Sequence, residues 1–284
     1  MKRFLLFLTL SVFLLTPALA GEAVEEPLTS AYLGQEKAWE SPTLSYTMDL
    51  YEVRGERCHL LRIRLEDPAR QIVKAQSEYH DALAESADLA RALPEARIVI
   101  NGSGYVSPVY PWIPDHYPGD SEDYHYTPLG SITVTDGQIY RFLEKVPYYG
   151  LTLESDGLHM YRGTPSAEVM LRQPIQTWSF YEGCPMVDDG RTVLDRTWSF
   201  AKARAKRTIL ARLKDGDILL FMVEGRLSLL DCCDFLVSSF APELVYDLDG
   251  GPSTALFLRD EEGAEPELIF GAGQQVVDVM GFIP

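Results

Sequence analysis

The chain has 284 residues and carries 42 acidic against 25 basic side chains, a formal net charge of −17 at pH 7. A surface this acidic repels nucleic acid and anionic membranes, which argues against both as partners. The length suffices for one large domain or two small ones. No repeat or low-complexity linker divides it, so we expect a single domain.

Residues 1–20 have the pattern of a secretory signal peptide. Two basic residues precede an apolar run at 4–15, and 18–20 form a small-x-small cleavage site. The apolar run is too short to span a membrane comfortably, and no second one follows, so we expect no integral membrane span. We expect the mature protein to be secreted or periplasmic. Residues 21–43 form a polar leader with the composition of a disordered segment, and 44–284 form the folded domain.

Apolar periodicity predicts many strands and few helices. Helices are expected at 81–93, which Pro94 ends, and at the apolar segment 229–240. Strands are expected at 44–53, 59–65, 72–76, 97–100, 131–135, 138–142, 151–154, 158–161, 207–213, 218–223, 244–248, 254–258, 267–270 and 276–282. This pattern predicts an α+β fold, a single domain with a mixed, mostly antiparallel β-sheet core and few helices.

A long irregular segment at 103–130 interrupts this pattern. It is rich in Pro, Tyr, Asp and His, and its aromatic residues argue against disorder and offer flat surfaces on which sugar rings stack. His116 and His125 lie within it among several acids, which makes them weak candidates for a metal site. A solvated acidic loop explains the same composition.

Two carboxylates stand where a predicted strand meets a pair of glycines. Asp247 and Asp249 are two residues apart, so on an extended strand they share a face. Gly250 and Gly251 let the backbone bend and let a ligand approach it closely. Paired acids beside bare backbone suit a sugar, phosphate or metal site, although acids also cap turns without any further role.

The main basic cluster enters the strand predicted at 207–213. It comprises Arg204, Lys206 and Arg207. A solvated strand end explains such a cluster. In a chain this acidic, Arg207 is also a candidate for a forked contact with a phosphate.

The four cysteines lack the C-x-x-C spacing of a structural zinc site. Export permits disulfides, and Cys232 and Cys233 are adjacent and poorly placed to bond to each other. The simplest expectation is buried thiols, with one bridge to Cys58 or Cys184 left open.

Taken in order, four segments resemble the phosphodiester glycosidase family. The matching segments are Asn101 and Gly102 after a strand, 183–190, Arg207 and Thr208 with 215–216 and 223–225, and 247–254. The resemblance covers about residues 70–284. The sequence departs from the family pattern at Asp247, where Asn is usual, at Pro252, which replaces a third Gly, and at Ala211, which replaces Gly.

The resemblance implies cleavage of the bond between a sugar's anomeric carbon and a phosphodiester oxygen. It implies that Arg207 holds the phosphate and that Asp249 activates water, acts as nucleophile or stabilises the cationic sugar centre. Asp247 and Ser253 would bind sugar hydroxyls or orient Asp249. The residues implied to bind substrate are Asn101, Gly102, Thr208, Gly250, Gly251 and Ser253.

The resemblance implies no definite cofactor, and its partner is a carbohydrate or sugar-phosphate substrate. A divalent cation that bridges Asp249 and the phosphate is left open. Two other functions remain as alternatives. One is an envelope polysaccharide-binding protein without activity, which the aromatic segment 103–130 would equally suit. The other is a metal-dependent phosphodiesterase that uses His116 and His125.

Overall fold

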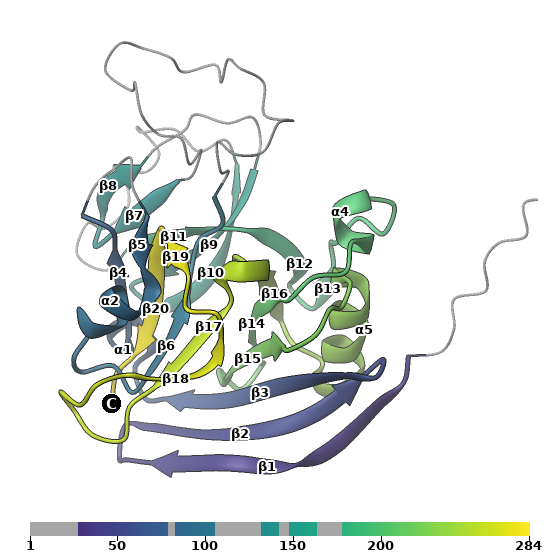
Figure 1. Ribbon diagram of the computed structural model, residues 1–284. Coiled ribbons are helices and arrows are strands. Elements are labelled where there is room, and N and C mark those ends of the chain that lie inside the picture. Colours follow the sequence, from purple (N-terminus) through teal and green to yellow (C-terminus); the bar gives the residue numbers. More distant parts are fainter. Residues whose placement is uncertain (1–27, 79–82, 106–131, 142–147, 164–177) are drawn as a thin grey trace, which may run out of the picture.

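Antiparallel strands make up most of the chain (Figure 1). The computed structural model describes residues 28–78, 83–105, 132–141, 148–163 and 178–284. Within these ranges the strands form three larger sheets and one two-stranded sheet, and every strand pair is antiparallel. The expected predominance of antiparallel strands is therefore confirmed, but the strands are shared among several sheets instead of forming one.

The largest sheet has eight strands in the order β1-β2-β3-β15-β14-β16-β12-β13. Its members are β1 (Ser30–Glu40), β2 (Leu44–Val53), β3 (Glu56–Leu65), β12 (Cys184–Asp188), β13 (Arg191–Thr192), β14 (Thr208–Arg212), β15 (Ile218–Val223) and β16 (Leu244–Asp247). The predicted hairpin of β2 and β3 is present. Arg54 and Gly55 form its turn with φ angles of 53° and 78°, the positive values that a tight two-residue turn requires.

The strand β1 corrects the expectation of a disordered leader at 21–43. It pairs with β2 along the whole of Ser30–Glu40 and forms one edge of the sheet, at the base of the molecule in Figure 1. Most of its side chains are exposed. An edge strand that is held mainly by backbone hydrogen bonds needs no apolar alternation, so its sequence lacks the usual signal.

Two five-stranded sheets pack near the eight-stranded one. One has the order β10-β9-β11-β7-β8 and the other β18-β17-β6-β20-β4, while β19 pairs with β5. Their strands are β4 (Ile72–Gln76), β5 (Ala84–Glu85), β6 (Ile98–Asn101), β7 (Thr133–Thr135), β8 (Gln138–Arg141), β9 (Tyr148–Glu154), β10 (Gly157–Gly163), β11 (Ser179–Glu182), β17 (Ala255–Leu258), β18 (Glu267–Gly271), β19 (Gln275–Val276) and β20 (Asp278–Phe282).

The core lies on both faces of the eight-stranded sheet. Leu210 and Tyr246 point to one face and pack with residues of the two five-stranded sheets, such as Ile100. Ile209 and Val245 alternate with them and pack on the other face, against α5. A strand that is apolar on both faces reads as a continuous hydrophobic run, which explains the sequences of β14 and β16.

Helices are few, as expected. The bounds are α1 (Pro68–Gln71), α2 (Ser86–Arg91), α4 (Ser199–Lys202) and α5 (Leu229–Phe240), with the 3₁₀ turn η2 (Gly251–Ser253). The helix α5 has the predicted bounds, begins at the N-cap Ser228 and ends at Ala241 in the left-handed conformation. In the part of the chain that is described, none of these helices is long and apolar enough to cross a membrane.

All four cysteines are buried free thiols. The bridge that was left open to Cys58 or Cys184 is not formed. Burial raises the pKa of the Cys58 thiol and of the Cys184 thiol to about 12, so neither carries much reactive thiolate at neutral pH.

The buried Lys74 side chain connects two of the sheets. The Lys74 ammonium on β4 lies 2.8 Å from a carboxylate oxygen of Asp278 on β20, and both side chains are almost fully buried. The same ammonium donates a hydrogen bond of 2.7 Å to the carbonyl oxygen of Phe180 on β11. Lys74 therefore ties the sheet of β4, β6 and β20 to the sheet of β11.

Lys74→Met should lower the free energy of unfolding by about 3–5 kcal/mol, because it leaves the Asp278 carboxylate buried without its cation. Urea unfolding at pH 7 measures this loss. The control is Lys37→Met, which breaks an exposed 3.9 Å pair with Glu267 and should cost less than about 1 kcal/mol. Equal losses in the two variants would contradict this role for the Lys74–Asp278 pair.

Candidate active site

The side-chain amide of Asn101 connects the segments that carry the predicted site residues. Asn101 is fully buried at the end of β6. Its Nδ2 donates to the carbonyl oxygen of Asp249 at 2.6 Å. Its Oδ1 accepts hydrogen bonds from the Thr208 hydroxyl at 2.9 Å and from the Ala255 amide at 3.0 Å. The amide thus holds the turn after β16 against β14 and β17.

Close backbone packing explains the glycines of this region. A side chain at Gly102 would collide with a carboxylate oxygen of Asp278, and one at Gly250 would come within 2.8 Å of the carbonyl oxygen of Lys206. Gly251 has a φ of 61° and donates its amide to the same Lys206 carbonyl at 2.9 Å. These glycines let three segments meet at one point.

Asp249 follows β16 and has a carboxyl group with one unused oxygen. Its Oδ1 accepts the amide of Gly250 at 2.9 Å. Its Oδ2 is buried and has no hydrogen-bond partner among the described residues. Burial raises the pKa of Asp249 to about 7. The nearby Ser253 hydroxyl and the Gly250 amide act against this rise, and the nearby carboxylates of Asp278 and Glu182 add to it.

Asp247 has the same combination of burial and an unused oxygen. It ends β16 and is 3% exposed. Its Oδ2 lies 3.4 Å from Nη1 of Arg207, while its Oδ1 is buried without a partner in the described part of the chain. Burial raises the pKa of Asp247 to about 7, against the effect of Arg207 and with a further contribution from Asp249.

The Arg207 guanidinium is committed to protein partners. Besides Asp247, it donates to the carbonyl oxygens of Ala203 at 2.7 Å and Leu227 at 3.4 Å, and it lies 5.1 Å from the ring centre of Phe200. It is 3% exposed. Arg207 thus meets Asp247 as one half of a buried ion pair, and within the described residues no contact joins it directly to Asp249.

The structure brings most of the predicted site residues together. Asn101, Thr208 and Asp249 are joined by the hydrogen bonds described above, and Asp247 ends β16 two residues before Asp249 and pairs with Arg207. Gly102, Gly250, Gly251 and Ser253 lie on the same segments. His116 and His125 fall outside the described residues. Within the described ranges, no group of three His, Cys, Asp or Glu side chains is arranged to hold a metal ion.

Sequence reasoning missed the polar layer behind Asp249. Ser103 donates its amide and its hydroxyl to the two carboxylate oxygens of Asp278, at 2.5 and 2.7 Å. The amide of Glu182 in turn donates to the Ser103 hydroxyl at 3.2 Å. Lys74 and Asp278 each interrupt an apolar strand, and an isolated charge in an apolar run is the signal that indicates a buried pair.

Asp249→Asn should flatten the pH dependence of stability. A carboxyl whose pKa is raised from 3.8 to about 7 keeps its proton in the folded chain and loses it in the unfolded chain, so the free energy of unfolding falls as the pH rises between these values. This fall is at most about 1.4 kcal/mol for each unit by which folding raises the pKa. Denaturant unfolding measures this effect. As the pH rises from 5 to 8, the free energy of unfolding of the variant should increase by at least about 1 kcal/mol relative to that of wild type.

The exposed acid Asp215, in the turn between β14 and β15, offers a matched control as Asp215→Asn. That variant should follow the wild-type pH dependence. A curve for Asp249→Asn that runs parallel to wild type from pH 5 to pH 8 would rule out the raised pKa.

Comparison with solved structures supports the fold. The catalytic domain of zebrafish N-acetylglucosamine-1-phosphodiester alpha-N-acetylglucosaminidase, auto-inhibited by its pro-peptide, matches with a TM-score of 0.61 and 16% identity. The match covers 90% of this chain and 88% of that one. A hypothetical protein from Synechocystis matches with a TM-score of 0.53 and 13% identity, over 90% of this chain and 72% of that one. At these identities the likeness concerns the fold alone.

Comparison with curated proteins returned no match. The family model described as phosphodiester glycosidase matches residues 94–283. That range contains the Asn101 amide, the Arg207–Asp247 pair and the turn at Asp249. It confirms the resemblance seen in the sequence, and the chain therefore belongs to the phosphodiester glycosidase family.

Proposed function

We propose that this protein is an exported hydrolase that cleaves the glycosidic C–O bond between a sugar and a phosphodiester in a glycan or envelope polymer. One observation carries the proposal. Two strand-end carboxyl groups, those of Asp247 and Asp249, each keep a buried oxygen without a partner among the described residues. Unused buried acceptors cost free energy in the empty protein, and they are what a site for a developing positive charge or a sugar hydroxyl requires.

The chemistry asks little of a general acid. Water adds its hydroxyl to the anomeric carbon and gives its remaining proton to the Asp249 carboxylate or to solvent. The C–O bond breaks, and the bonding pair leaves with the phosphate oxygen as a phosphomonoester. This leaving group is already a stable anion and needs little protonation. The main requirement is stabilisation of the cationic sugar centre. Asp249 in its ionised form meets that requirement as nucleophile, base or electrostatic partner.

Arg207 has a positioning role in this proposal. Its guanidinium holds Asp247 and two carbonyl oxygens, so a phosphate would reach it only by displacing one of them. Removing it would leave Asp247 buried without its cation, and Arg207→Ala therefore perturbs folding as well as catalysis. The residue that tests the proposal cleanly is Asp249.

Asp249→Asn should lower kcat/KM by at least about 10²-fold, because the amide keeps the shape of the side chain but cannot carry its charge. Release of free sugar from methyl 1-phosphodiesters of N-acetylglucosamine, glucose and mannose measures this loss. Asp215→Asn, which removes an exposed acid at the opposite end of β14, should retain wild-type activity. The proposal fails if the wild-type protein releases no sugar, or if Asp249→Asn is as active as wild type.

The wild-type pH profile provides a second readout of the same assay. Because the pKa of Asp249 is raised to about 7 and the ionised form reacts, kcat/KM should rise through neutral pH and level off above it. A profile that is already flat between pH 5 and pH 8 would separate Asp249 from the reacting group.

Glycan binding without cleavage is a second candidate function, and one surface feature favours it. Trp198, the N-cap residue of α4, and Phe200 within α4 are 45% and 43% exposed, with ring centres 4.8 Å apart. Exposed aromatic faces of this kind stack on sugar rings. The guanidinium of Arg207 contacts the Phe200 ring, which connects this surface to Asp247.

Trp198→Ala should weaken binding of the protein to an envelope polysaccharide at least about fivefold, through the loss of one stacking surface. Affinity electrophoresis in gels that contain the polysaccharide measures the effect, and Val193→Ala, at another exposed apolar position, is the control. A pure binding protein would bind the polysaccharide with this dependence and release no sugar in the cleavage assay. Unchanged mobility of Trp198→Ala would remove the support for this second function.

A further inference from the structure

A pocket of about 660 Å³ opens beside the glycine turn of the candidate site. Strands β1, β2, β3 and β18 contribute to its walls together with Lys206 and Glu224. Two contacts join it to the turn. The Lys206 carbonyl accepts the Gly251 amide at 2.9 Å, and the amide of Ala272, directly after β18, donates to the Thr254 carbonyl at 3.3 Å. The turn that follows Asp249 is therefore hydrogen-bonded to Lys206 in the pocket wall and to the residue directly after Gly271, another wall residue.

The charge of the pocket differs from that of the whole chain. Its walls carry three basic side chains, Lys37, Arg57 and Lys206, and two acidic ones, Glu36 and Glu224, whereas the chain as a whole has 25 basic and 42 acidic residues. The acids are already engaged. Arg57 lies 2.9 Å from Glu36 and 3.2 Å from Glu224.

The ring of His59 contacts the same two acids, Glu36 and Glu224. Its two nitrogens lie 2.9 Å from Glu36 and 2.6 Å from Glu224, and the ring is largely buried against Phe270. Both carboxylates are thus turned toward Arg57 and His59. An anion that enters the pocket therefore meets two carboxylates that already contact Arg57 and His59.

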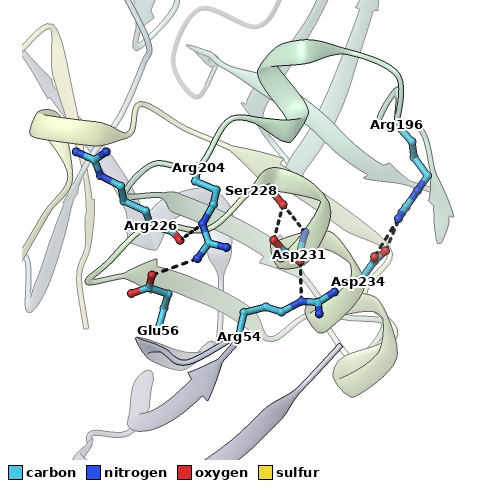
Figure 2. A network of polar contacts seen from close by, with 8 residues as sticks. All are labelled: Arg54, Glu56, Arg196, Arg204, Arg226, Ser228, Asp231 and Asp234. Atoms are coloured by element: carbon cyan, nitrogen blue, oxygen red, sulfur yellow. Dashed lines mark hydrogen bonds and ion pairs between the residues drawn. The ribbon is translucent and has the colours of Figure 1, made fainter. Parts of the chain in front are cut away.

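The basic cluster at 204–207 has one member left for a ligand. Arg204 donates to the Glu56 carboxylate at 3.2 Å and to the Arg226 carbonyl at 3.1 Å, as Figure 2 shows. Arg207 is buried against Asp247. The Lys206 ammonium has no hydrogen bond or ion pair with any residue that the structure describes, and it lies 5.8 Å from the ring centre of Phe270 at the pocket wall.

We propose that this pocket receives the leaving-group side of the substrate, with Lys206 as the contact for its phosphate. The identity of the ligand rests on the proposed function. A lysine ammonium binds a phosphate as a compact point charge, and here it would stabilise the negative charge that grows on the phosphate as the glycosidic bond breaks. Phe270 and Met48 offer an apolar surface to the group beyond the phosphate, so phosphomonoesters with an apolar or ring-containing alcohol are the chemical class that fits.

Phenyl phosphate is a suitable probe because it is a phosphomonoester with a ring and has no glycosidic bond. Calorimetric titration of the full-length protein at low salt should give a dissociation constant that rises at least tenfold in Lys206→Met and returns toward wild type in Lys206→Arg. Lys214→Met removes the same charge from an exposed turn at the far end of β14 and should change it less than twofold. Wild-type binding should weaken with added NaCl, because the contact is a charge pair near the surface.

The outcomes separate this inference from the proposed function. Phenyl phosphate binding that is absent in wild type, or equal in Lys206→Met and wild type, overturns the inference, while sugar release by the wild-type protein would still support the hydrolase. Binding that depends on Lys206 in a protein that releases no sugar would keep the pocket assignment and end the hydrolase proposal. With both intact, Lys206→Met should raise KM for the sugar phosphodiester and Lys214→Met should not.

Discussion

The side chain of Asn101 is the constraint on which the candidate site depends. One buried amide satisfies three backbone or hydroxyl partners that come from β14, β17 and the turn after β16. A buried amide that lost one of these partners would leave unpaired polar groups in the core, so the three segments are held in a single arrangement. The glycines at 102 and 250 permit the close approach, and the amide fixes it. Asp247 and Asp249 owe their positions to this junction.

The centre of the protein concentrates acidic groups and neutralises only some of them. Asp278 has Lys74, and Asp247 has Arg207, while Asp249 has only an amide and a hydroxyl. Acids gathered in a dry environment hold their protons to higher pH, which explains why both strand-end carboxyls have a raised pKa. Such acids reduce the stability of the fold. They are useful for a reaction, and raised pKa values cluster at functional sites.

The sequence predicted local features well and long-range ones poorly. The helix α5, the hairpin of β2 and β3 and the acidic turn after β16 follow from patterns within a few residues, such as apolar periodicity and a glycine pair. The strand β1 was missed because edge pairing leaves no apolar signal. The partners Lys74 and Asp278 are 204 positions apart, and periodicity does not relate residues at that distance. Likewise, Arg207 was identified as a site residue, but its partner Asp247, 40 positions away, became known only from the pairing of β14 with β16.

The edge strand β1 has a consequence for any shortened form of this protein. It begins ten residues after the signal cleavage site expected at Ala20. Because its sequence resembles a flexible leader, a shortened protein would normally be designed without it. A protein that starts at residue 44 would lose Glu36 and Lys37 from the pocket wall. It would also uncover the whole backbone edge of β2, and an unpaired strand edge of that length attracts other chains. Poor solubility of such a fragment would then reflect a broken sheet and would say nothing about the stability of the intact fold.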